Sequence, residues 1–175
     1  MALQKIDVRD LHMNPMTLIS DEWMLITAGN QERGYNTMTA CWGHMGAIWG
    51  HGEGLPTTII YIRPQRYTKE FIDREEFYTL SFFPKKYKKD LAYLGTHSGR
   101  DGDKVSRVGL TPVFGADCTW FEEAKLVLVC RKLYHAPLLE EGFTDFKIVE
   151  QNYPERDFHE MYVGKIVEAY LDSEE

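Results

Sequence analysis

Cysteine is scarce in this chain, and the few cysteines present form no recognisable pattern. The 175 residues contain Cys41, Cys118 and Cys130, which are odd in number, far apart and without a C-x-x-C spacing. This argues against a disulfide framework and a zinc knuckle, so we expect three reduced, buried thiols. His44 and His51 lack a third ligand at a suitable spacing, so we expect no metal site.

Long apolar runs and leader patterns are missing as well. The chain has no stretch of about 18 apolar residues and no basic segment followed by an apolar one at its start. We therefore expect a cytoplasmic protein with no membrane partner. A G-x-G-x-x-G motif after a strand is also absent, which argues against a Rossmann-type nicotinamide site.

The charge balance argues against a further class of function. The net charge of -7 is unfavourable for nucleic-acid binding, which needs a broad basic face. Positive charge is concentrated between Arg63 and Arg107, where 11 Lys and Arg stand against 7 Asp and Glu. Such a segment suits a small anionic ligand, although solvated helix faces would give the same count.

What the chain does contain is the pattern of a mainly β protein, organised as a single domain over residues 1–175. We expect strands at 23–28 and 36–42 as a hairpin, and at 59–62, 77–83, 124–139 and 160–171. In the last strand Met161, Val163, Val167, Ala169 and Leu171 are expected to share one face. Short helices are expected at 68–76, at 84–95 and within 143–156. This order predicts a barrel with helical insertions.

The stretch from Thr57 to Thr68 carries the first indication of a ligand site. An apolar β run ends at Arg63, because Pro64 cannot continue it, and Thr68 is expected to be the N-cap of a helix. Free N–H groups at the helix start, with Arg63 and Arg66 beside them, would bind a phosphate dianion. A capped helix with two solvated arginines explains the same stretch.

Small residues in the second strand of the hairpin indicate a place for a flat ligand. Thr39, Ala40 and Cys41 would let such a ligand approach the backbone, with Asn36 and Trp42 at its flanks. A tightly packed barrel strand would have the same composition.

The glycine-rich loop 95–104 offers a second candidate for anion binding. Its glycines allow backbone N–H groups to converge on an anion, which Arg100 or Lys104 could neutralise. A plain surface turn is the alternative explanation.

Taken together, four motifs resemble those of the flavin reductase-like family, and of its flavoredoxin-like members in particular. They are Asn-Thr-Met-Thr-Ala-Cys-Trp-Gly (36–43), Tyr-Ile-Arg-Pro-Gln-Arg-Tyr-Thr-Lys-Glu-Phe-Ile (61–72), Leu-Ser-Phe-Phe (80–83) and Ser-Gly-Arg-Asp-Gly-Asp-Lys (98–104). The resemblance covers about residues 16–171 and implies an FMN-binding split β-barrel with short helical insertions. It also implies a homodimer with flavin near the subunit interface.

The resemblance implies a set of cofactor-binding residues. Residues 39–42 would meet the isoalloxazine ring, while residues 63–68 and 98–104 would hold the ribityl phosphate. The full set is Asn36, Met38, Thr39, Ala40, Cys41, Trp42, Arg63, Pro64, Gln65, Arg66, Tyr67, Thr68, Ser98, Gly99, Arg100, Asp101 and Lys104. Cys41 stands where serine is common in the family, and His159 and Tyr162 resemble its C-terminal aromatic cluster.

These implications predict an FMN-dependent oxidoreductase that takes a hydride from NADH or NADPH and passes the electrons to free flavin or another acceptor. Hydride transfer needs no general acid or base, so no catalytic residue is assigned. Two alternatives remain open. One is a flavoredoxin-like FMN electron carrier without nicotinamide activity, and the other is a non-redox module that binds a different phosphate ligand.

Overall fold

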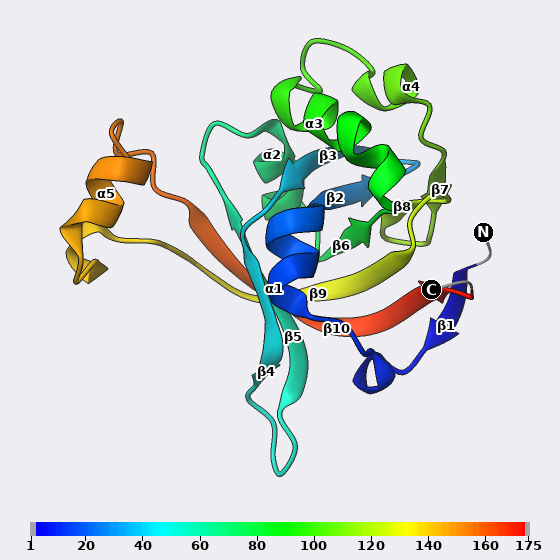
Figure 1. Ribbon diagram of the computed structural model, residues 1–175, viewed down its shortest axis with the longest axis horizontal. Coiled ribbons are helices and arrows are strands. Elements are labelled where there is room, and N and C mark those ends of the chain that lie inside the picture. The colour runs from blue at the N-terminus through cyan, green and yellow to red at the C-terminus, as the bar shows by residue number, and fades with distance from the viewer. Residues whose placement is uncertain (1–2, 174–175) are drawn as a thin grey trace.

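The computed structural model describes residues 3–173, most of which belong to a large antiparallel sheet with short helices around it (Figure 1). The strands are β1 (Leu3–Ile6), β2 (Met24–Asn30), β3 (Gly34–Ala40), β4 (Gly43–Ile48), β5 (Leu55–Ile62), β6 (Phe77–Phe82), β7 (Pro112–Phe114), β8 (Thr119–Phe121), β9 (Leu126–Pro137) and β10 (Glu160–Asp172). The helices are α1 (Pro15–Thr17), α2 (Tyr67–Arg74), α3 (Lys88–Thr96), α4 (Lys104–Val108) and α5 (Phe146–Asn152).

The connection between two edge strands explains why the sheet curls. The hydrogen-bonded order is β3-β2-β6-β9-β10-β5-β4, with β1 added to the far half of β10. The two ends of this order, β3 and β4, are joined by only Cys41 and Trp42. A link of two residues requires the two edges to meet at one corner, so the sheet closes there and stays open elsewhere.

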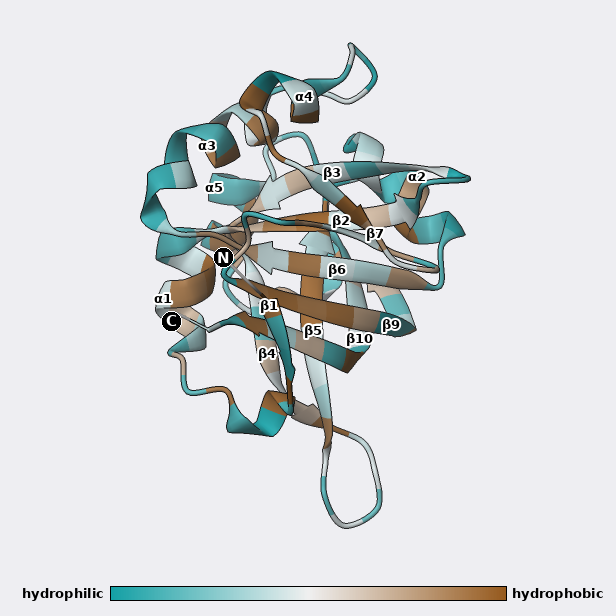
Figure 2. Cartoon of the chain, turned by 90° about the vertical axis from the view of Figure 1, so that its right-hand side faces the viewer, coloured by the Kyte–Doolittle hydropathy of each residue, from teal (hydrophilic) through white to brown (hydrophobic). Residues whose placement is uncertain are grey.

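Apolar residues fill the inside of this barrel and cover part of its outer surface. Inside lie side chains such as Ile60, Ile62 and Leu128, all fully buried. Outside, α3 and α4 contribute Leu94 and Val105 to a second cluster against β8 and β9. Along β9, residues 126–130 are all buried, whereas residues 131–137 are exposed or half-buried. Figure 2 shows the apolar colouring concentrated on the central strands.

The barrel interior also contains the polar hydroxyl of Tyr78, which leaves no room for a side chain at Gly164. The Tyr78 hydroxyl lies 2.8 Å from Thr58 Oγ1, which lies 3.3 Å from the Cys130 thiol. A Cβ on Gly164 would stand 2.3 Å from the Tyr78 oxygen, so only glycine fits on β10 at this point. Burial raises the pKa of Cys130 to about 12, which keeps its thiol protonated and unreactive.

Several sequence predictions are wrong in detail. Cys118 and Cys130 are buried as expected, but Cys41 is exposed because it lies in the corner link beyond the end of β3. Thr68 is not an N-cap, since α2 begins one residue earlier and has Arg66 at its cap position. β1 and β4 were not expected. The glycines of β4 hide its strand pattern in the sequence.

The expected common face of the last strand is wrong as well. β10 buries Tyr162, Val163, Ile166 and Ala169, while Val167 is 40% exposed. Its pairing with β9 shifts register between Val163 and Gly164 and again before residue 168. The first shift adds Leu133 to β9, and the second adds Val167 to β10, so the inward-facing side of β10 changes between Ile166 and Ala169, which a strict period of two cannot anticipate.

Two segments project from the barrel (Figure 1). One is the tip of the β4–β5 hairpin, with Ile48 and Trp49 exposed. The other consists of residues 138–159 between β9 and β10, which carry α5 away from the sheet, and we call it the arm. The helix expected within 143–156 is therefore confirmed as α5. Within residues 3–173, no helix is long and apolar enough to cross a membrane.

Candidate functional site

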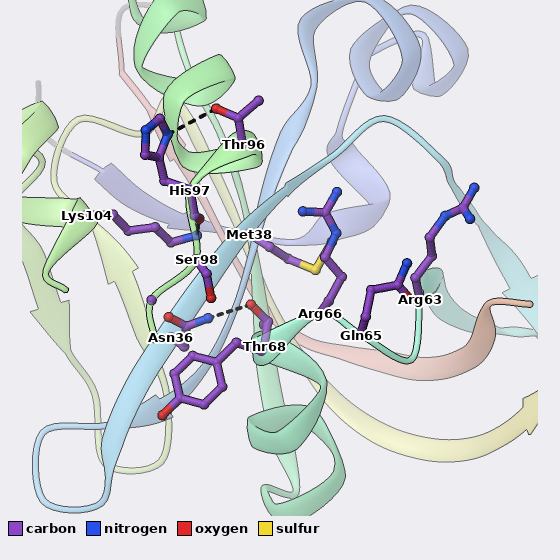
Figure 3. A pocket seen from close by; sticks show the side chains of 12 residues that line it. Asn36, Met38, Arg63, Gln65, Arg66, Thr68, Thr96, His97, Ser98 and Lys104 are labelled. Carbon is purple, nitrogen blue, oxygen red and sulfur yellow. Dashed lines mark hydrogen bonds between the residues drawn. The ribbon is translucent and has the colours of Figure 1, made fainter. Parts of the chain in front are cut away.

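A polar cavity of about 400 Å³ lies where three predicted segments converge (Figure 3). It is enclosed by β3, by the turn that leads into α2, and by the loop between α3 and α4. The lining residues are Asn36, Met38, Arg63, Gln65, Arg66, Tyr67, Thr68, Thr96, His97, Ser98, Gly99 and Lys104. We call it the first cavity. It is lined by three cationic side chains and by no carboxylate.

Close packing of α3 on β3 sets one wall of the first cavity. Thr39 Oγ1 donates a hydrogen bond to the Leu91 carbonyl at 2.5 Å, and the Cβ of Thr39 lies against Gly95. A Cβ on Gly95 would come within 3.2 Å of that atom, so a larger residue would push the helix away. Thr39 therefore supports the cavity from behind rather than lining it.

Asn36 fixes the floor of the first cavity. Its side-chain amide donates to Thr68 Oγ1 at 2.8 Å, so the Thr68 hydroxyl keeps its own proton to donate elsewhere. Both residues are buried. A Cβ on Gly99 would lie 2.1 Å from Asn36 Oδ1, so any larger residue here would displace the Asn36 side chain.

Lys104 brings a buried positive charge to the first cavity. Its ammonium donates to the carbonyl oxygens of Leu94 at 2.8 Å and His97 at 2.9 Å, and its side chain forms no ion pair with another described residue. Burial, with a smaller effect from Arg66, lowers the pKa of Lys104 to about 8. The ammonium has three donors, so one is left for a ligand. A buried cation held only by dipoles is strongly predisposed to bind an anion.

Arg66 and the start of α2 add further donors. Arg66 Nη1 donates to the Gly95 carbonyl at 2.9 Å, and the guanidinium pairs with no carboxylate among the described residues. No side chain caps the first turn of the eight-residue helix α2, and its first two residues, Tyr67 and Thr68, line the cavity. Arg66 and the start of α2 therefore lie together with Lys104 around the first cavity.

Arg63 lines the first cavity, but its guanidinium is committed to the arm. Nη1 lies 2.5 Å from Asp157 Oδ2, and Nη2 donates to the Asn152 carbonyl at 2.8 Å. Gln65 donates to the same Asp157 oxygen at 2.8 Å. These hydrogen bonds, that of Gln65 first, hold the pKa of Asp157 below its ordinary value. Figure 3 shows the Arg63 side chain turned away from Arg66 and Lys104.

Other predicted residues lie outside the first cavity. Arg100 forms an ion pair with Glu70 and stacks on Tyr67 with its guanidinium carbon 4.5 Å from the ring centroid. Neither Asp101 nor Pro64 nor Ala40 lines the cavity. Arg100 therefore supports Tyr67 from outside.

A second cavity, of about 850 Å³, adjoins the corner link. It lies between the arm, α1 and the start of β4, and it contains the two remaining predicted residues, Cys41 and Trp42. Its lining is Pro15, Met16, Ile19, Ser20, Cys41, Trp42, Gly43, His44, Met45, Tyr61, Leu138, Phe143, Ile148 and Tyr153. β3 thus connects the two cavities, with Asn36 and Met38 at one and the corner link at the other.

Three aromatic side chains, Tyr153, His159 and Trp42, connect the arm to the corner link beside the second cavity. The Tyr153 hydroxyl lies 2.8 Å from His159 Nδ1, and the His159 ring lies 5.0 Å from the Trp42 ring. Burial first, and then the charge of Arg63, lowers the pKa of His159 to about 4, so the imidazole is neutral near pH 7. Tyr162 lines neither cavity, because its hydroxyl donates to Asp73 Oδ1 at 2.6 Å.

Sequence reasoning missed the residues that depend on tertiary structure. Thr96 and His97 complete the first cavity, and their place within the glycine-rich loop 95–104 was the only signal. The lining of the second cavity comes from α1, β4, β5 and the arm. Their apolar residues look like ordinary core residues in the sequence. Among the described residues, no group of three or more His, Cys, Asp or Glu is arranged to hold a metal ion.

Comparison with known proteins identifies the fold. No family model and no curated protein sequence matches the chain. Flavoredoxin of Desulfovibrio vulgaris (Miyazaki F) superposes with a TM-score of 0.64 at 20% identity, covering 87% of this chain and 70% of the other. The FMN-binding domain of a flavin reductase-like enzyme from Shewanella baltica gives a TM-score of 0.67 at 13% identity, covering 98% and 78%.

A third similar structure is an NADH:FAD oxidoreductase from Streptomyces globisporus, with a TM-score of 0.62 at 14% identity, covering 86% of this chain and 75% of the other. The chain therefore has the split-barrel fold of flavin reductase-like and flavoredoxin proteins. The predicted fold class is confirmed.

Proposed function

We propose that this protein is an FMN-dependent oxidoreductase that accepts a hydride from NADH or NADPH and passes the electrons to a further acceptor. The observation that carries the proposal is the first cavity, where Lys104 and Arg66 converge without any carboxylate. Such a site binds an anion of high charge, as the phosphate of FMN is near neutral pH. The split-barrel relatives, which include an FMN-binding domain and an NADH:FAD oxidoreductase, support the same ligand class.

The residues between the two cavities fit the rest of FMN. β3 is an edge strand, so the backbone groups on its outer side are not used by the sheet. From Asn36 in β3 to Cys41 in the corner link the extended chain spans about 17 Å at the usual rise per residue, a length comparable with that of extended FMN. The backbone of residues 39–42 is then available to hydrogen-bond the edge of a flat ring, as the sequence suggested.

The chain would supply binding and orientation, while the bound flavin supplies the hydride chemistry. Lys104, Arg66, Thr68 and Ser98 would hold the phosphate. Because His159 is neutral and lies close to Trp42, it adds no charge beside the proposed position of the flavin ring. The apolar second cavity would keep water away from the reacting face.

We also propose that the protein works as a homodimer. Ile48 and Trp49 on the hairpin tip and Leu139 and Phe146 on the arm are large apolar residues between 44% and 54% exposed. Both segments project from the barrel, where a second copy would cover them. Light scattering at micromolar concentration should give twice the 20.4 kDa chain mass. A monomer that retains its flavin would contradict this proposal.

Substitution of Arg66 tests the assignment of the phosphate. Arg66→Ala removes a charge-assisted hydrogen bond, so FMN affinity should fall by about 1.5 to 3 kcal/mol. Riboflavin, which has no phosphate, should bind almost unchanged. Arg107→Ala is a matched control, because Arg107 is exposed on α4 and lines neither cavity. Equal weakening of both ligands would show that Arg66 does not recognise the phosphate.

Nicotinamide activity needs its own measurement, since flavoredoxins are among the similar structures. The FMN-loaded protein should oxidise NADH or NADPH in the steady state when free FMN is added. Bound flavin without nicotinamide oxidation would favour the electron-carrier alternative. A purified protein that binds no FMN would favour the non-redox phosphate-binding module.

A further inference from the structure

The second cavity has a lining that differs in chemistry from the first. None of its fourteen lining residues is Asp, Glu, Lys or Arg, and most are apolar or aromatic. Its volume, about 850 Å³, is within the usual range for small-molecule sites. Moving a sulfonate or phosphate group into such surroundings, without a cation to pair with it, is strongly unfavourable. The lining therefore selects for uncharged ligands.

The few polar groups of the second cavity are suited to a carbonyl oxygen. The Tyr61 hydroxyl lies 3.2 Å from His44 Nδ1, and the Tyr153 hydroxyl lies 2.8 Å from His159 Nδ1. Where the histidine donates, the phenol keeps its proton for a ligand. Tyr61 and Tyr153 both line the cavity, so a ring with carbonyl groups finds donors as well as apolar contacts.

The position of the second cavity connects it with the proposed redox centre. Cys41 and Trp42 belong both to its lining and to the segment proposed to meet the flavin ring. A ligand in the second cavity would therefore lie next to that ring, whereas the phosphate would be held at the other end of β3. The pyrophosphate of a nicotinamide nucleotide would have to remain outside, because no cation lines the cavity.

We propose that the second cavity is the electron-acceptor site and that it takes uncharged, carbonyl-bearing aromatic rings of the quinone class. This inference rests on the proposed function. Bound FMN in its reduced form would supply the hydride and solvent water one proton, so that the quinone would become a hydroquinone and the flavin would be reoxidised. One cavity then serves the nicotinamide ring and the acceptor in turn.

Binding of redox-inert rings tests the site without turnover. Naphthol and naphthalene sulfonate share one ring system and differ in charge, so we compare them by calorimetry on the FMN-loaded protein. Naphthol should bind at least tenfold more tightly than the sulfonate. Equal binding of the two, or no naphthol binding to a protein that holds FMN, would overturn the inference.

Charged substitutions in the wall provide the second test. Ile148→Glu places a carboxylate on α5, at a position that is 44% exposed and so tolerant of a polar side chain. Met16→Glu does the same from the opposite wall, where the side chain is 69% exposed. Each should weaken naphthol at least tenfold and lower kcat/KM for duroquinone similarly, while FMN affinity is unchanged.

Gln151→Glu is the matched control, since it adds the same charge to α5 at an exposed position outside the cavity. It should behave like the unsubstituted protein. If FMN binds and NADH reduces it, but the wall variants bind naphthol normally, the acceptor site is wrong and the proposed function stands. If FMN does not bind at all, the proposed function fails first. Wall variants that bind naphthol normally but change a dimer into a monomer would assign the cavity to a second copy instead.

Discussion

Lys104 should make FMN binding depend on pH in a way that riboflavin binding does not. Its ammonium is buried against the carbonyl groups of Leu94 and His97, and burial with the nearby Arg66 lowers its pKa to about 8. The phosphate of FMN, with a second pKa of about 6, is already a dianion above pH 7. Raising the pH from 7 to 9 therefore removes the proton from Lys104 without changing the ligand.

The direction and size of the pH effect on FMN affinity follow from the coupling between phosphate binding and protonation of Lys104. A bound dianion raises the pKa of Lys104, so the complex keeps the proton that the free protein loses above pH 8. With a pKa of about 8, roughly nine tenths of the free protein is protonated at pH 7 and one tenth at pH 9. FMN affinity should hence be nearly constant below pH 8 and about tenfold weaker at pH 9. Lys104→Met should lose about 1.5 to 3 kcal/mol, or roughly 10- to 150-fold, at pH 7.

Quenching of flavin fluorescence during titration with the flavin-free protein measures these affinities. Riboflavin should bind equally at both pH values, and the Lys104→Met protein should bind FMN with a flat profile. Lys89→Met, at an exposed position of α3 outside the cavity, controls for the loss of one charge. A parallel fall for FMN and riboflavin, or an unchanged profile in Lys104→Met, would refute the role of Lys104.

Three further predictions concern residues around the cavities. Gly99→Ala should displace the Asn36 side chain and weaken FMN binding at least tenfold in a flavin titration. Gly46→Ala, whose added methyl group would meet open space, should leave FMN binding unchanged. Arg63→Met should weaken the binding of FMN and riboflavin equally, because Arg63 holds the arm. A loss of affinity confined to FMN in the same titration would show that Arg63 contacts the phosphate. Cys41→Ser should retain NADH-dependent FMN reduction within about threefold, and a hundredfold drop with flavin still bound, about 2.7 kcal/mol, would give the thiol a chemical role.

The sequence predicts the first cavity well because its parts are local. Pro64 ends a strand before Arg66 and α2, and that order alone places free N–H groups beside cations. The loop with Ser98, Gly99 and Lys104 is recognisable from its glycines and charges. What the pattern cannot give is the partner of each charge. Arg63 and Arg66 look equivalent in the sequence, and only the tertiary contact with Asp157 separates them.

The second cavity and the register of β10 lie beyond sequence reasoning for another reason. The cavity walls come from α1, β4 and the arm, which meet only after the sheet has curled around the link at Cys41 and Trp42. Before that closure, Met16 and Ile148 are ordinary apolar residues. In β10, one extra residue at Val167 alters which side chains face inward, and its residue type does not predict a bulge. The exposure of Cys41 follows from the same link.

The turn from Arg63 to Arg66 connects the two cavities mechanically. Arg66 faces the anion site, while Arg63 and Gln65 in the same turn hold Asp157 of the arm. The arm in turn supplies Tyr153, which lines the second cavity and contacts His159 beside Trp42. A shift of the arm should therefore move the turn that we propose to hold the phosphate, and an anion bound at that turn should restrain the arm. It follows that substitutions at Asp157 should alter flavin affinity and acceptor binding together, even though this carboxylate lines neither cavity.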